Sequence, residues 1–147
     1  MHKGIIGMSD DISIAFDGTE YQLPGADETA REKAILEKVN EEQRRLGRQI
    51  VAVQGMGFVG AVMAVIVADA TDATGEPVYF VHGHQRPSRR SFWKVPVING
   101  GKPPVEAEDP EVPEMFSRCV LEKKTLRATW HDYVYELADI VVVEIQL

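Results

Sequence analysis

The chain has 147 residues and a formal net charge of −7 at pH 7, with 44% hydrophobic and 27% charged residues. This composition is typical of a single globular domain with a buried core, and the negative charge argues against a nucleic-acid or membrane-surface binder. The single cysteine, Cys119, excludes a disulfide within the chain and favours a reducing compartment, so we expect a cytoplasmic protein. We predict neither a signal peptide nor a membrane span, because the longest apolar run, residues 58–68, is too short to cross a bilayer.

Residues 11–23 predict a β-hairpin. Apolar and polar side chains alternate on both sides of Asp17-Gly18, a pair that adopts a tight turn at little cost. The residues expected to share the apolar face of the first strand are Ile12, Ile14 and Phe16.

A helix is predicted after the hairpin, from an N-cap at Asp27 to a closing Gly47. Acidic residues occupy its first turns and arginines its last, as the helix dipole favours. Its apolar stripe is thin, so we interpret the helix as a surface element. The stripe consists of Ala34, Ile35, Val39 and Leu46.

The rest of the chain alternates predicted strands and helices, which favours a parallel sheet with right-handed crossovers. Between them, a basic connection at 85–94 is expected to be partly helical, and the Pro/Gly-rich segment 96–113 to be irregular. The predicted strands are 49–54, 78–83, 126–130 and 139–147, and the predicted helices are 57–70, 114–124 and 131–138.

The pattern Gly55-x-Gly57-x-x-Gly60 follows the first of these strands and opens the next helix. In this context, three glycines are typical of a Rossmann dinucleotide-binding turn. Gly55 would allow the tight turn, Gly57 would let the backbone approach a pyrophosphate, and Gly60 would let the helix pack closely on the strand. The N–H groups near Phe58 and Val59 would point at the phosphates. A glycine-rich turn without a ligand is the alternative.

We therefore predict an α/β fold, with a Rossmann-like parallel sheet and flanking helices at 49–147, preceded by a hairpin-and-helix extension at 1–48. The helix at 57–70 is apolar on nearly every side, whereas a helix that covers one face of a sheet normally keeps a polar outer face. We expect it to be covered on both sides, by the extension or by another domain or subunit. A homo-oligomer is thus left open.

The acid that receives the ribose hydroxyls of NAD at the end of the second strand of such folds is missing. We place that position at His82, and the basic residues that follow it are Arg86, Arg89, Arg90 and Lys94. A site that lacks the carboxylate and has arginines nearby favours binding of the 2′-phosphate of NADP. The alternatives are NAD, another anionic ligand, or a solvated basic loop without a ligand. His82 and His84 have no evident third ligand, so no metal site is predicted.

Three segments resemble the N-terminal domain of the UDP-glucose/GDP-mannose dehydrogenase family of nucleotide-sugar dehydrogenases. They read "VAVQGMGFVG", "INGGKPPVEAEDPEVPEMF" and "LRATWHDYVYELADIVVV", and they span roughly residues 49–147. Beyond the glycine turn, the positions that carry the resemblance are Asn99 to Glu106, Arg127, Thr129, Asp132 and Ala138-Asp139.

The resemblance implies an NAD-binding domain that supports oxidation of a sugar C6 hydroxyl to a carboxylate. It places cofactor contacts on the glycine turn, at the end of the second strand, in the basic connection and, on the nicotinamide side, at the end of the last strand. Together with Gly55, the expected cofactor-binding residues are Gly57, Phe58, Val59, Gly60, His82, Arg86, Ile145 and Gln146.

Such enzymes use a catalytic cysteine, with lysine and acid partners, in later parts of the chain, and Cys119 does not fit that role. We expect a cofactor domain that is not catalytic alone, most simply a fragment of a longer enzyme whose other domains hold the nucleotide sugar. The alternatives are a non-catalytic NAD(P)-binding or regulatory module and an NADP-linked reductase of other specificity.

Overall fold

The structure is a computed structural model that describes residues 11–144, so the predicted site residues Ile145 and Gln146 lie outside the described part. Its elements are β1 (Ile12–Ile14), β2 (Glu20–Gln22), α2 (Ala26–Arg45), β3 (Gln49–Gln54), α3 (Phe58–Asp69), β4 (Tyr79–His84), α4 (Lys94–Asn99), α5 (Glu111–Ser117), the π-helical turn η1 (Arg118–Glu122), β5 (Leu126–Thr129), α6 (Val134–Leu137) and β6 (Ile140–Val143). The segment predicted to be irregular thus contains most of α4 and the start of α5.

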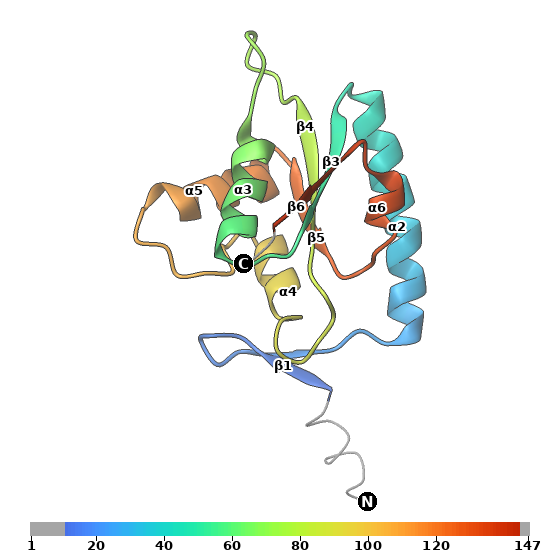
Figure 1. The fold of residues 1–147 in the computed structure, drawn as a ribbon, viewed down its shortest axis with the longest axis vertical. Coiled ribbons are helices and arrows are strands. Elements are labelled where there is room, and N and C mark those ends of the chain that lie inside the picture. The colour runs from blue at the N-terminus through green and yellow to red at the C-terminus, as the bar shows by residue number, and fades with distance from the viewer. Residues whose placement is uncertain (1–10, 145–147) are drawn as a thin grey trace, which may run out of the picture.

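Four parallel strands form one sheet in the order β5-β4-β3-β6 (Figure 1). The buried, β-branched strand β3 lies inside the sheet, with β4 and β5 on one side of it and β6 on the other. The strand order therefore changes direction at β3, and the carboxyl ends of β3 and β6 meet at the switch point where open α/β sheets bind ligands. The predicted Rossmann-like parallel sheet is confirmed.

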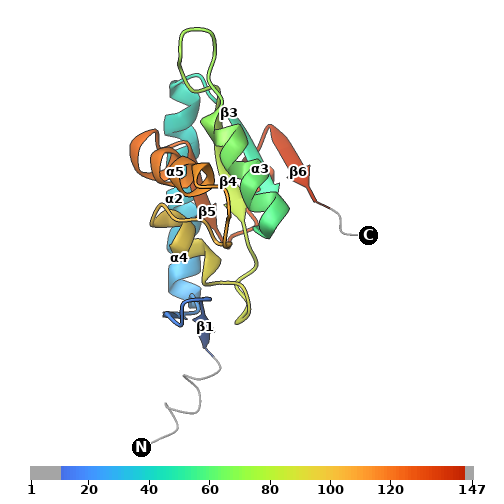
Figure 2. The same cartoon turned by 90° about the vertical axis from the view of Figure 1, so that its left-hand side faces the viewer.

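Helices cover both faces of the sheet (Figures 1 and 2). Helices α3, α4 and α5 lie on one face, where the main core includes Val65, Val81 and Phe116. Helices α2 and α6 lie on the other face, where the smaller core consists of Leu36, Ala52 and Val134. Within residues 11–144, none of the helices combines the length and the apolar character that a membrane crossing requires.

The buried side of α2 is mostly polar, and the predicted apolar stripe is wrong. Ile35 and Leu46 are 44% and 63% exposed. The residues that α2 buries are Glu32, Leu36, Asn40 and Gln43. Polar side chains can be buried here because they have partners: Glu32, for example, accepts hydrogen bonds from Arg127 and Thr129.

The hairpin is confirmed, with Ile12 paired to Gln22 and Ile14 to Glu20, but its predicted apolar face is reversed. Ile14 is 57% exposed, whereas its neighbour Ser13 is fully buried. The reason is a specific contact: the Ser13 Oγ accepts a hydrogen bond from the backbone N–H of Trp93 at 3.0 Å, which turns the polar face inward.

Helix α3 is buried on one side only. Its small residues, among them Ala61 and Ala64, face the core, whereas Met63 and Ile66 are 38% and 54% exposed. Helix α2 lies on the opposite face of the sheet, so the N-terminal helix does not provide the expected second cover (Figure 1). Cover by another domain or subunit stays a prediction.

Candidate functional site

The glycine-rich turn joins the carboxyl end of β3 to α3. Gly55 has φ +87°, a backbone conformation that favours glycine. A Cβ on Gly60 would collide with the carbonyl oxygen of Gly55 and lie 3.1 Å from its carbonyl carbon. Gly55 thus has the conformation of a tight turn, and Gly60 allows α3 to approach the turn closely, directly after the end of β3.

The N-terminus of α3 is open. Its N-cap, Gly57, is extended (φ −75°, ψ −168°), and a Cβ there would meet nothing within 4 Å. Within residues 11–144 no side chain caps the helix, its first turn has no acid, and its first internal bond runs from Ala61 N–H to Gly57 O at 2.9 Å. The N–H groups of the first turn have no hydrogen-bond partner among the described residues, and the helix dipole favours an anion there. The carboxylate of Glu144 lies close to this turn, with Oε2 3.5 Å from the position of a Cβ on Gly60.

Gln85, the first residue after β4, contacts this turn. Its Oε1 accepts a hydrogen bond from Met56 N–H at 3.0 Å, and its own N–H donates to Thr129 O at 3.0 Å. Gln85 therefore occupies the strand-end position where an acid would receive a ribose. Sequence reasoning missed it because the predicted strand, 78–83, lies one residue before the observed β4, and because the acid position was placed at His82, inside the strand.

The placement of His82 at the strand end, and with it the predicted cofactor contact, is wrong. β4 continues to His84, and His82 is fully buried on the α2 face, with Nε2 3.4 Å from Asn40 Oδ1. Burial, with a smaller contribution from the charge of Arg127, lowers the pKa of His82 to about 3, so its ring is neutral. A side chain without exposed surface cannot contact a cofactor.

A hollow of about 520 Å³ lies at the carboxyl ends of β4 and β5. It includes the predicted site residue Arg86, together with an aromatic ring and segments from the N-terminal extension. The residues that line it are Asp11, Leu23, Pro24, Thr29, His84, Arg86, Pro87, Trp130, His131 and Asp132.

Hydrogen bonds fix the side chains of this hollow. His84 Nδ1 lies 2.8 Å from the Tyr135 hydroxyl and Nε2 lies 3.2 Å from Trp130 O, while Trp130 Nε1–H donates to Thr29 Oγ1 at 3.1 Å. Burial raises the pKa of Tyr135 to about 12 and lowers that of His84. Tyr135 therefore donates to Nδ1, and a neutral His84 donates from Nε2.

The predicted basic cluster is divided between two places. Arg86 lines the hollow at the ends of β4 and β5, whereas Arg89 and Arg90 line a separate hollow with Ile12 and Ile14. Of these arginines, the structure therefore brings only Arg86 to the candidate cofactor edge.

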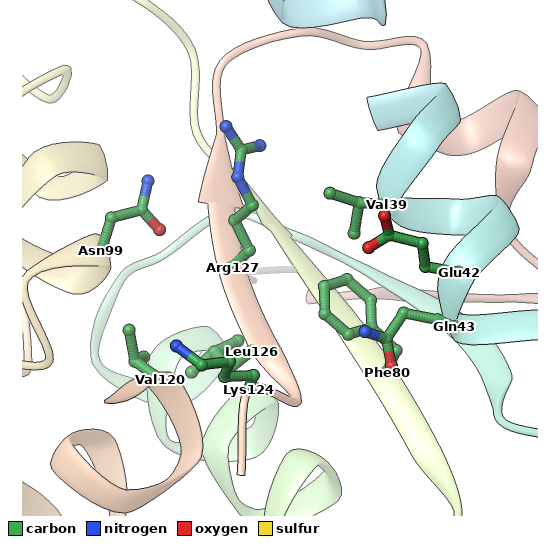
Figure 3. A pocket seen from close by; sticks show the side chains of 9 residues that line it. All are labelled: Val39, Glu42, Gln43, Phe80, Asn99, Val120, Lys124, Leu126 and Arg127. Atoms are coloured by element: carbon green, nitrogen blue, oxygen red, sulfur yellow. The ribbon is translucent and has the colours of Figure 1, made fainter. Parts of the chain in front are cut away.

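A further hollow of about 440 Å³ lies along the outer edge of β5, between α2 and η1 (Figure 3). It contains none of the predicted cofactor residues. Arg127 reaches it but is held by Glu32 at 2.6 Å, and Asn99 pairs through its amide with both backbone groups of Ala128. These two positions of the family resemblance serve the framework of the fold.

Cys119 is fully buried, and burial raises the pKa of its thiol to about 11. A protonated thiol without access to solvent is not a nucleophile. That Cys119 has no catalytic role stays an expectation, and its burial is consistent with a structural position in the core.

Neither the protein-family models nor the curated proteins compared contain a match to this chain. Among solved structures, the chain is similar to the NDP-N-acetyl-D-galactosaminuronic acid dehydrogenase from Methanosarcina mazei Go1, with a TM-score of 0.59 and 31% sequence identity. The match covers 76% of this chain and 22% of that chain, so this chain spans about a fifth of the dehydrogenase's length. At this identity and coverage, the chain is similar to one part of a nucleotide-sugar dehydrogenase.

Proposed function

We propose that this chain is the nicotinamide-dinucleotide-binding domain of a nucleotide-sugar dehydrogenase. The observation that carries the proposal is the open N-terminus of α3 at the switch point of the sheet, where Gly57 leaves a space that a side chain would fill. The similarity to a sugar-nucleotide dehydrogenase adds the reaction class. With further domains, the protein would oxidise the C6 hydroxyl of a UDP- or GDP-sugar to a carboxylate.

In this proposal the pyrophosphate of the cofactor binds to the N–H groups of Phe58, Val59 and Gly60. These groups donate to no partner within the described residues, and the positive end of the helix dipole adds to the attraction. Bound there, the nicotinamide ring would accept a hydride from the sugar. In this proposal the chain orients the cofactor, and its buried, protonated Cys119 is not the catalytic nucleophile.

The region after β4 affects the choice between NADP and NAD. Gln85 is neutral where an acid would repel a 2′-phosphate, and Arg86 adds a positive charge, so both favour NADP. Asp11 and Asp132 line the hollow at the ends of β4 and β5 together with Arg86. Their carboxylates suit the free ribose hydroxyls of NAD instead. NAD and NADP are therefore both retained, and titration distinguishes them.

The test compares wild type, Gly57→Ala and Gly57→Val by calorimetric titration with NAD, NADH, NADP and NADPH. We expect wild type to bind at least one of them, and Gly57→Val to bind at least about tenfold more weakly because a branched side chain occupies the site of the pyrophosphate. Gly57→Ala should be intermediate.

Met63→Ala is the matched control, because Met63 lies on the exposed side of the same helix and away from the turn. The proposal requires unchanged binding in this variant, and Gly57 variants that stay folded with a loss of stability under about 1 kcal/mol. A wild-type chain that binds none of the four dinucleotides, or a Gly57→Val variant that binds like wild type, would overturn it.

A further inference from the structure

The β1–β2 hairpin precedes the predicted dinucleotide-binding unit, and the structure places it beyond the carboxyl edge of the sheet. Figures 1 and 2 show it next to α4 and the N-terminal end of α2. Its position is fixed by the buried hydroxyl of Ser13, which accepts from Trp93 N–H, and by the ring of Phe16, whose centroid lies 5.3 Å from that of Trp93. The hairpin is therefore docked on the ligand-binding edge.

Three residues of this segment line the hollow at the ends of β4 and β5: Asp11, Leu23 and Pro24. Two of them are joined by a hydrogen bond from Leu23 N–H to Asp11 O at 2.7 Å. Leu23 and Pro24 contribute apolar surface, and the hollow also contains the indole ring of Trp130. Apolar and aromatic surface of this kind suits the flat face of a purine.

Gln85 contacts the glycine turn and lies in sequence between two residues that line the hollow. Its carboxamide accepts from Met56 N–H in the turn, and the residues on either side of it, His84 and Arg86, line the hollow. A diphosphate on the N-terminus of α3 would therefore lead past Gln85 into the hollow. Its polar groups, Arg86 and Asp132 among them, could receive the ribose.

We infer that residues 11–24 form a fixed wall of the nucleotide site and contact the adenosine half of the dinucleotide. The inference rests on the proposed function, and it adds that the unit starting at β3 is insufficient for full affinity. The purine would lie against Leu23, Pro24 and Trp130, so the extension contributes to the recognition of adenosine.

The test uses the full chain and calorimetric titration with ADP-ribose and with nicotinamide mononucleotide. Leu23→Ala should lower the affinity for ADP-ribose about tenfold, and Pro24→Ala about threefold, because each substitution removes apolar contact with the purine. Neither should change the affinity of nicotinamide mononucleotide relative to wild type. Ile14→Ala is the matched control, since it alters the same hairpin at a side chain that lies outside this hollow and is 57% exposed.

A second measurement does not depend on a variant that folds. Saturating ADP-ribose should slow hydrogen exchange at the backbone N–H of Leu23, because a bound purine stabilises the segment that holds its bond to Asp11. Nicotinamide mononucleotide should leave this exchange unchanged.

The outcomes separate this inference from the proposed function. The wall formed by residues 11–24 is refuted if Leu23→Ala and Pro24→Ala bind ADP-ribose as well as wild type does. It is also refuted if Ile14→Ala loses as much affinity for ADP-ribose as Leu23→Ala. In both cases the proposed dinucleotide site stands. If wild type binds neither ADP-ribose nor any dinucleotide, the proposed function itself fails. Selective loss in the two wall variants, with slowed exchange at Leu23, supports the inference.

Discussion

Burial of a neutral His82 should make stability depend on pH between 7 and 5. The pKa of His82 is about 3 in the folded chain against an ordinary value of 6.5, so below pH 6.5 the unfolded chain binds a proton that the folded chain does not. Stability is therefore fully present above pH 6.5 and falls as the pH is lowered towards 3. Between pH 7 and pH 5 the loss from this residue is about 2 kcal/mol.

The assay is urea unfolding of wild type and His82→Leu at both pH values, followed by the fluorescence of Trp93 and Trp130. The variant should lose about 2 kcal/mol less than wild type between pH 7 and pH 5, since leucine does not titrate. Phe80→Leu is the control: Phe80 is 3% exposed and its ring packs on His82, so this variant should lower stability equally at both pH values. Equal pH dependence in wild type and His82→Leu would refute the buried, neutral histidine.

Five further variants test the turn, the cofactor edge and the framework. Gly60→Ala should lower the free energy of unfolding, measured in urea, by about 3 kcal/mol because its Cβ collides with backbone. Gly57→Ala should lower it by under about 1 kcal/mol because its Cβ meets open space, and similar losses in both variants would contradict this geometry. If NADP is the ligand, Arg86→Ala should weaken the binding of NADP about tenfold and that of NAD little. Arg90→Ala should change the affinity for neither, and equal losses of affinity in both variants would indicate a nonspecific basic loop. Glu32→Ala should cost about 3 kcal/mol in urea because it leaves its arginine partner without a counter-ion, and a loss below about 1 kcal/mol would show that the pair is dispensable.

The alternation of elements and the glycine turn could be predicted because their signals are local. Strand β3 was placed residue for residue, since a short β-branched run that ends at glycine has few other readings. The hairpin was found from Asp17-Gly18, whose turn chemistry is likewise contained in a few neighbouring residues.

What the sequence did not predict depends on distant partners. The inward face of α2 is polar because Glu32 meets Arg127 across 95 positions, and no periodicity along the helix encodes that pair. Ser13 turns inward for the same kind of reason, through Trp93. His82 was misplaced because the end of a strand is set by its register with a neighbour, here Gln54 beside His84.

The attachment of α2 has a consequence for the order of folding. Its side chains are held by residues from the last part of the chain: Thr29 by Trp130, Glu32 by Arg127 and Arg44 by Asp139, across 95 to 101 positions. During synthesis this helix leaves the ribosome before the groups that fasten it, so these contacts form only after Arg127, Trp130 and Asp139 have been made. Contacts between residues so far apart in sequence slow folding, because the intervening chain must be closed into a loop before they can form.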